Sequence, residues 1–212
     1  MNKLKQAARW CGRHLVLTCY AVYLAAVLAV GLCGFAADSI LRAAGKLQTV
    51  ELSAADFEPV NLAGEGDGWR SQTADPQLLY HADGRVLTVR AELSFDADQG
   101  ELDLYYTEAP GEDFDKYRRV WAVRQADGSY LYKLPRTHID TLRLDPGSAE
   151  NLGITIGRIW LNEPVGLAGY FDLSLNGLFR LAVYPALAAA AMQYLLSVWR
   201  DARRKANGKG SC

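Results

Sequence analysis

Two short acidic segments carry the side chains best suited to holding a metal ion. Their carboxylates belong to Asp96 and Asp98 in the first segment and to Glu112, Asp113 and Asp115 in the second. Calcium takes about six to eight oxygen ligands, and neither segment has the spacing of a complete calcium-binding loop. Solvated acidic turns are the favoured interpretation, a structural calcium ion is the alternative, and no other cofactor is expected.

Side chains suited to catalysis are sparse. Of the three histidines, His14 lies at the edge of an apolar run, and His81 and His138 lie in or beside predicted turns. The sequence contains no Gly-x-Ser-x-Gly motif and no His-x-x-x-His zinc pair. The glycines of "GEGDG" lie in an acidic segment that would repel a phosphate group. We therefore predict that the protein is not an enzyme.

Aromatic side chains offer a different chemistry, the binding of sugars. A sugar presents C–H faces that stack on aromatic rings, and its hydroxyl groups need polar partners beside the ring. Strand alternation places Tyr130 and Tyr132 on one face, where nearby arginines would complete a polar and aromatic platform. The candidate glycan-binding residues are Trp69, Tyr105, Tyr130, Tyr132, Arg119 and Arg124. This set supports protein–protein contact equally well, and each ring taken singly is explained by ordinary strand propensity.

The chain that positions these side chains has an uneven distribution of charge. Residues 1–37 carry four bases and no acid, and residues 38–176 carry 23 acids and 13 bases. Residues 177–212 carry six bases and one acid. An acidic middle therefore lies between two basic ends, and no nucleic-acid partner is expected.

Each basic end borders an uncharged apolar run. As helices, residues 15–37 and 181–199 are long enough to cross a hydrocarbon core of about 30 Å. We predict two transmembrane helices in the lipid bilayer of a bacterial cytoplasmic (inner) membrane. Because basic flanks stay inside, the N-terminus (residues 1–14) and the tail (residues 200–212) are predicted to be cytoplasmic and the middle periplasmic or extracellular.

Alternatives remain open for both apolar runs. The second run also fits a buried amphipathic helix. A cleaved signal peptide explains the first run poorly, because the run is longer than a typical signal-peptide core. Small residues recur every four positions, and this spacing predicts that the spans pack on each other or on a partner membrane protein, unless alanine is simply common here. The residues concerned are Ala21, Ala25 and Ala29 in the first run and Ala182, Ala186 and Ala190 in the second.

The middle segment, residues 47–164, lies between connectors at residues 38–46 and 165–180 and is typical of β structure. Residues 86–95 alternate, which predicts one core face and one solvated face. Asp-Gly in "ADGSY" and "HADGR" predicts tight turns, and "DADQG" predicts a hairpin between residues 86–95 and 101–107. Many short strands at regular spacing predict a mainly β fold, an antiparallel, jelly-roll-like β-sandwich flanked by two transmembrane helices.

The segment "TLRLDPGSAENLGITIGRIWLN", residues 141–162, predicts a corner between two strands. Asp-Pro-Gly ends the first strand and turns the chain. The apolar pattern slips between Ile156 and Ile159, which predicts a β-bulge near Gly157. We expect the Asp145 carboxylate to accept hydrogen bonds from N–H groups of its own turn, with metal or ligand binding as the alternative. The corner is therefore predicted to be structural.

A resemblance rests on "WRSQTADPQLLY", "ELDLYYTEAPGEDFDKYRRVWA" and "YLYKLPRTHIDTLRLDPGSAENLGITIGRIWL". This ordered series resembles the galactose-binding-like (carbohydrate-binding-module-like) β-sandwich found outside the membrane in bacterial polytopic glycosyltransferases and surface-polysaccharide assembly proteins. It covers roughly residues 50–162. Such proteins usually carry many spans and this sequence has two, so the resemblance implies the module and not the transferase activity.

The leading hypothesis is a non-catalytic, membrane-anchored accessory protein of cell-envelope glycan assembly. Its sandwich would bind glycan or dock on a polytopic membrane glycosyltransferase. The alternative is a structural or scaffolding membrane protein whose sandwich makes protein–protein contacts and has no sugar ligand.

Overall fold

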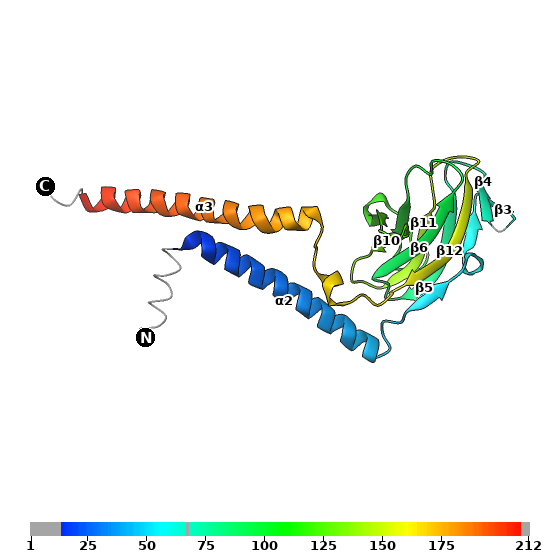
Figure 1. The fold of residues 1–212 in the computed structure, drawn as a ribbon, viewed down its shortest axis with the longest axis horizontal. Coiled ribbons are helices and arrows are strands. Elements are labelled where there is room, and N and C mark those ends of the chain that lie inside the picture. The colour runs from blue at the N-terminus through cyan, green and yellow to red at the C-terminus, as the bar shows by residue number, and fades with distance from the viewer. Residues whose placement is uncertain (1–13, 67, 209–212) are drawn as a thin grey trace. The chain divides into compact units, whose positions relative to one another are not determined.

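The computed structural model describes residues 14–66 and 68–208, so the predictions for residues 1–13 and 209–212 lie outside the described residues. The chain divides into two units, which Figure 1 shows as ribbons. One unit consists of the residues up to Ala37 and from Val165 onward, and it contains most of the two long helices. The other unit, Asp38–Pro164, contains the β structure.

Two helices are long and apolar enough to cross a membrane: α2 (Leu15–Ala43) and α3 (Leu175–Gly208). Helix α2 begins where the first apolar run begins and continues into the predicted connector. Helix α3 begins before the second run and contains Pro185. The short helix η3 (Leu167–Tyr170) precedes it.

Aromatic side chains, not the predicted alanine stripes, join α2 to α3. The Tyr20 hydroxyl donates a hydrogen bond to the carbonyl of Ala182, and the rings of Tyr23 and Tyr184 meet edge to face. All six stripe alanines are exposed: Ala21, Ala25, Ala29, Ala182, Ala186 and Ala190. The prediction that these stripes pack the two helices together is wrong, because larger rings fill the contact; packing on a partner stays a prediction.

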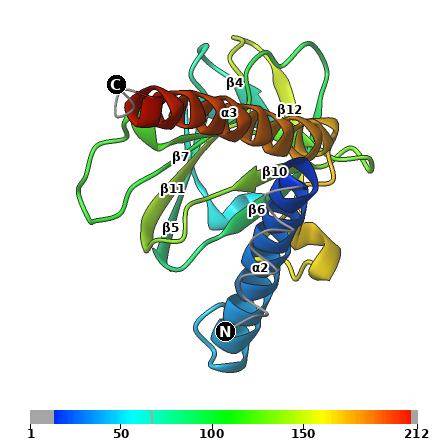
Figure 2. The same ribbon diagram turned by 90° about the vertical axis from the view of Figure 1, so that its left-hand side faces the viewer.

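The described strands of the second unit form two antiparallel sheets that face each other, as Figure 2 shows, so the predicted β-sandwich is confirmed. One sheet has the order β3–β4–β12–β6–β10–β9, with β1 also paired to β12, and the other has the order β2–β5–β11–β7–β8. The bounds are β1 Val50–Leu52, β2 Glu58–Val60, β3 Leu62–Glu65, β4 Gly68–Ser71, β5 Gln77–Gly84, β6 Thr88–Phe95, β7 Asp103–Tyr106, β8 Arg119–Trp121, β9 Val123–Arg124, β10 Tyr130–Lys133, β11 Ile139–Asp145 and β12 Gly153–Leu161, with the short helices η1 Ala54–Asp56 and η2 Lys116–Arg118.

The hydrophobic core lies between the two sheets and follows the period-two pattern of the strands. In β6 the predicted inward residues Val89, Ala91 and Leu93 are all buried. In β11 the leucines Leu142 and Leu144 are 2% and 1% exposed. Successive strand side chains point to opposite faces, so the residues between these core positions must lie on the outer faces.

Only one of the three predicted turns makes a hairpin. "ADGSY" joins β9 to β10, where Arg124 is paired with Tyr130. The hairpin predicted at "DADQG" is wrong, because β6 and β7 lie in different sheets. The tight turn predicted at "HADGR" falls at the end of β5, and the chain then crosses to β6 in the other sheet. Asp83 does take a positive φ of 38°. A turn residue bends the chain, but the need to cover both faces of the core decides which sheet the next strand joins.

The corner at residues 141–162 also crosses between the sheets, since β11 and β12 belong to different ones. The predicted bulge in β12 is confirmed: Ile156 is opposite Leu93, whereas Ile159 is opposite Ala91. Strand β12 therefore holds one extra residue at this point. A Cβ added to Gly157 would lie 2.9 Å from Cβ of Glu92, so the bulge sits closely on β6.

Candidate functional site

The outer face of the five-stranded sheet gathers the most chemically distinctive side chains of the sandwich. Strand pairing places Arg143 of β11 opposite Tyr105 of β7, and Tyr105 opposite Arg119 of β8. Leu142 and Leu144, on either side of Arg143, point into the core. Arg143, Tyr105 and Arg119 therefore form one row across three neighbouring strands on the outward side.

Aromatic rings and guanidinium groups lie next to one another on this row and beside it. The Arg119 guanidinium lies 3.7 Å from the ring centroid of Trp121 and 5.9 Å from that of Tyr105. The Arg143 guanidinium lies 5.1 Å from the Tyr105 ring and 5.8 Å from the Phe114 ring. These distances fall within the range of cation–π attraction. We call this set, Trp121, Arg119, Tyr105, Arg143 and Phe114, the ring–guanidinium ladder.

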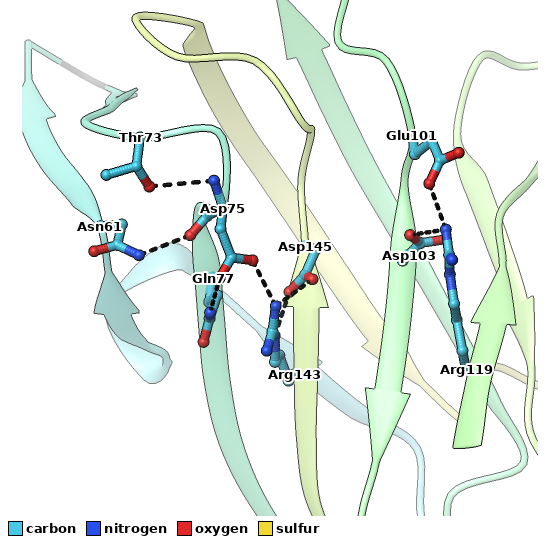
Figure 3. Close-up of polar contacts among 9 residues, drawn as sticks. All are labelled: Asn61, Thr73, Asp75, Gln77, Glu101, Asp103, Arg119, Arg143 and Asp145. Atoms are coloured by element: carbon cyan, nitrogen blue, oxygen red, sulfur yellow. Dashed lines mark hydrogen bonds and ion pairs between the residues drawn. The ribbon is translucent and has the colours of Figure 1, made fainter. Parts of the chain in front are cut away.

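Carboxylates occupy the next row and hold the guanidinium groups in place. Asp145 is paired in register with Asp103, and Asp103 with Trp121. Arg143 donates from Nε and Nη2 to the two oxygens of Asp145, each at 2.7 Å, and Nη2 also lies 2.6 Å from Oδ1 of Asp75, as Figure 3 shows. Bidentate bonds of this kind fix the orientation of a guanidinium plane.

Arg119 is held by a second pair of carboxylates (Figure 3). Its Nη2 lies 2.5 Å from Oε2 of Glu101 and also forms an ion pair with Asp103. The Asp103 side chain is only 8% exposed, and among the described residues its Oδ1 has no hydrogen-bond partner. Nε of Arg119 is also buried without a partner there. Buried polar atoms without hydrogen-bond partners are uncommon in proteins, and two of them lie together on this face.

Asp75, in the loop between β4 and β5, is fixed by its neighbours. Its backbone N–H donates to the Thr73 hydroxyl at 3.2 Å, and its carbonyl accepts from the Asn61 side-chain amide at 2.9 Å. The Gln77 amide donates to Oδ2 of Asp75 at 2.7 Å. The Asp75 side chain is still 58% exposed, so the face presents a carboxylate that is both positioned and accessible.

Burial changes the acidity of the carboxylate at the end of β11. It raises the pKa of Asp145 to about 6, and the neighbouring acids Asp75 and Asp103 act in the same direction. The hydrogen bonds from Arg143 lower this pKa but do not cancel the effect of burial. The expectation that Asp145 bonds to N–H groups of its own turn is corrected, because the side chain is paired with Arg143.

The structure brings together only two of the predicted glycan-binding residues, Tyr105 and Arg119. Tyr130 and Tyr132 are 7% and 0% exposed and belong to the core, so the predicted surface platform at these rings is wrong. The two tyrosines share one face of β10, as predicted. The other face carries Leu131, so the pattern alone did not indicate which face was inward, and the structure shows that the tyrosine face is. Arg124 is exposed on β9, in the other sheet.

Trp69 lies apart from the ladder, beside a groove of about 380 Å³ that Phe95, Arg70 and Asp96 also line. Its strand partner is the core residue Ile154, so the ring packs at the edge of the core. Trp69 therefore does not complete a surface with Tyr105 and Arg119.

The carboxylates of the acidic segments are bonded to backbone N–H groups and to arginines, in local turns for Asp98, Glu112 and Asp115 and across the sheet for Asp96. Asp96 accepts from the N–H of Gly153 at 2.8 Å, and Asp98 accepts from the N–H of Gly100 at 3.1 Å. Asp115 accepts from the N–H of Tyr117 at 2.9 Å. Glu112 accepts from the N–H of Glu108 and pairs with Arg118, and Asp113 is exposed. Within residues 14–66 and 68–208 no three acidic, histidine or cysteine side chains are grouped as metal ligands would be. A structural calcium ion at these segments stays a prediction.

Several residues of the ladder face were not singled out from the sequence as ligand-binding. Arg143 and Asp145 share a strand face by alternation, but Asp-Pro-Gly favours a structural turn at this position. Trp121 and Phe114 precede Arg143 by 22 and 29 residues in the sequence, and Asp103 precedes it by 40. Their proximity comes from the pairing of β11, β7 and β8, which is not a local property of the sequence.

No protein-family model matches the chain, and no curated protein sequence matches it. Solved structures similar to it include a low-affinity xylan-binding module from Roseburia intestinalis (13% identity, 58% of this chain and 98% of that chain, TM-score 0.38). Another is a β-1,3-glucan-binding module from Bacillus halodurans (12% identity, 56% of this chain and 97% of that chain, TM-score 0.37). With TM-scores this low the matches assign no ligand to this chain, and the two-sheet sandwich is established by the strand pairing itself.

Proposed function

We propose that this chain is a non-catalytic, membrane-anchored protein whose β-sandwich binds carbohydrate on the ring–guanidinium ladder. The observation that carries the proposal is the ladder itself, in which rings and hydrogen-bonding groups alternate across β8, β7 and β11. Trp121, at one end, is 58% exposed and offers a ring face for the C–H face of a sugar. The other rings of the ladder are partly buried and support the guanidinium groups.

Polar groups beside the rings can serve as the hydrogen-bond partners that sugar hydroxyl groups need. Asp75 and Glu101, with side chains 58% and 63% exposed, can accept hydrogen bonds from sugar hydroxyl groups. Both carboxylates are already held by arginines. Little side-chain freedom would be lost on binding, which favours affinity.

The membrane part of the proposal rests on α2 and α3 and on the basic segments that flank them. We propose that both helices cross the bacterial cytoplasmic membrane, with both chain ends cytoplasmic and the acidic sandwich outside. A role in cell-envelope polysaccharide assembly, including docking on a membrane glycosyltransferase, follows from the sequence resemblance and stays a prediction.

The test uses the full chain in detergent micelles and a panel of soluble polysaccharides. Trp121→Ala should weaken binding by about tenfold, the equivalent of about 1.4 kcal/mol, because an exposed stacking ring is lost. Tyr117→Ala is the matched control, since Tyr117 is 82% exposed and lies outside the ladder. Absence of binding to every polysaccharide, or equal loss in both variants, would contradict the proposal.

Protein docking is a second candidate, and a specific observation favours it. Tyr117, Trp121 and Val123 are 82%, 58% and 57% exposed. They lie on or beside β8 and β9, which are edge strands of the two sheets. Exposed aromatic residues along the open edge of a sheet suit a protein partner. Capture of a partner by the full chain that is lost in both Tyr117→Ala and Trp121→Ala, without polysaccharide binding, would favour this function.

A further inference from the structure

The ladder face carries more negative than positive charge. Its two guanidinium groups, Arg119 and Arg143, meet four carboxylates, those of Asp75, Glu101, Asp103 and Asp145. With all six groups ionised the formal net charge is −2. Each guanidinium is already paired with two carboxylates, so neither presents an uncompensated positive charge to a ligand.

The surplus negative charge is placed where a ligand can meet it. Asp75 and Glu101 are the exposed members of the four, and they stand at the Arg143 and Arg119 positions respectively. Asp103, which shares Arg119 with Glu101 and is paired in register with Asp145, has a side chain that is 8% exposed, and its Oδ1 has no partner among the described residues. A buried carboxylate oxygen without a donor leaves its negative charge poorly compensated, and this charge adds to the attraction of the exposed carboxylates for a cation.

We propose that the carbohydrate recognised by this face carries free, protonated amino groups, as in a de-N-acetylated glucosamine oligomer. This inference rests on the proposed function and names the class of its ligand. Ammonium groups are attracted by the surplus carboxylates while the sugar rings stack on Trp121. Polymers of uronic acids or phosphates are disfavoured, because they would meet this charge within a domain that is itself acidic.

The experiment compares two ligands that differ only in the amino group. The full chain in neutral detergent micelles is titrated with the β-1,4-linked glucosamine hexamer and with its N-acetylated counterpart, at a pH that keeps the amine protonated. We expect the free-amine hexamer to bind about tenfold more tightly, the equivalent of about 1.4 kcal/mol. The difference should shrink as salt is added, because the attraction is electrostatic.

Isosteric variants connect the preference to this face. Asp75→Asn together with Glu101→Gln keeps the shape and the acceptors toward the arginines but removes two charges, and it should abolish the preference. Glu51→Gln together with Glu150→Gln removes the same charge from exposed positions elsewhere on the sandwich, and this variant should keep the preference for the free-amine hexamer. A preference that survives Asp75→Asn/Glu101→Gln would overturn the inference.

The failure of this inference is distinguishable from failure of the proposed function. Equal or tighter binding of the N-acetylated hexamer, or Trp121-dependent binding of neutral polysaccharides alone, overturns the amine preference and leaves sugar binding in place. Absence of binding to both hexamers and to every neutral polysaccharide overturns both. Tight binding of polygalacturonate would overturn the electrostatic argument directly.

Discussion

In strand β11 the guanidinium of Arg143 donates two hydrogen bonds of 2.7 Å to the carboxylate of Asp145, two residues farther along the same strand. Alternation brings both side chains to one face of the sheet. Asp145 is 8% exposed, so its carboxylate lies in a poorly solvated place even with this partner. The pair orients the Arg143 guanidinium of the ladder, but burial of Asp145 makes its carboxylate harder to ionise.

This cost predicts a pH dependence of stability. The pKa of Asp145 is about 6 in the folded protein, against an ordinary value of 3.8. Between these values the folded state holds a proton that the unfolded chain has lost. The stabilising contribution is therefore fully present below about pH 4 and is lost as the pH rises through 6. Relative to Asp145→Asn, the free energy of unfolding of the parent protein should fall by on the order of 2 kcal/mol from pH 4 to pH 7.

The measurement is denaturant unfolding of both proteins in the same micelles at several pH values, followed by tryptophan fluorescence. Other titrating groups act on both proteins alike, so the difference between the two curves isolates Asp145. A difference that stays constant with pH, or that grows in favour of the parent protein as the pH rises, would contradict a raised pKa.

The strands of the sandwich could be predicted because their signal is local. Alternation in residues 86–95 identified Val89, Ala91 and Leu93 as core residues, and the slip between Ile156 and Ile159 identified the bulge. Each of these features depends on neighbouring residues in one strand. The apolar helices are local in the same sense, because length and composition define them.

Strand partners could not be predicted, because they depend on contacts between distant segments. "DADQG" has good turn residues, yet β6 and β7 join different sheets. The ladder has the same origin: Arg143 and Arg119 are brought to one row by the pairing of β11, β7 and β8. For Tyr130 and Tyr132 alternation indicated a shared face but did not indicate which face was inward.

Tyr132 provides a prediction about the core. Its side chain is fully buried, and among the described residues its hydroxyl has no hydrogen-bond partner. Tyr132→Phe keeps the ring packing and removes the unpaired group, so it should stabilise the protein by about 1 kcal/mol and leave polysaccharide binding unchanged. Tyr132→Ala, which removes the ring as well, should cost about 3 to 5 kcal/mol. Destabilisation by Tyr132→Phe would show that the hydroxyl is paired after all.

Membrane topology can be tested by cysteine labelling in intact cells. The described native cysteines, Cys19 and Cys33, are first replaced by serine, as are those at positions 11 and 212. Tyr117→Cys, at a site 82% exposed, should then react with a membrane-impermeant maleimide from outside. Arg203→Cys, in the basic tail, should react only after the membrane is permeabilised. The reverse pattern would overturn the proposed orientation.

Asn162 joins three backbone segments where the chain leaves the sandwich. Its Oδ1 accepts from the N–H of Leu87 at 2.7 Å, and its Nδ2 donates to the carbonyls of Gln48 at 3.1 Å and Arg85 at 2.8 Å. Asn162 is 4% exposed and has a positive φ of 54°. Asn162→Ala should therefore destabilise the protein by about 3 kcal/mol, through backbone strain and the loss of three part-buried hydrogen bonds to the backbone.

Asn151 separates these two causes. It has a similar φ of 60° but is exposed, and its backbone N–H and carbonyl are hydrogen-bonded to Ser71 and Arg70. Asn151→Ala should cost only about 1 kcal/mol, the part due to backbone strain. Glycine relieves strain at both positions, so Asn151→Gly should be nearly neutral while Asn162→Gly remains clearly destabilising. Equal losses in the two alanine variants would mean that the Asn162 side chain contributes little and that β1, β6 and β12 hold the chain exit by backbone pairing alone.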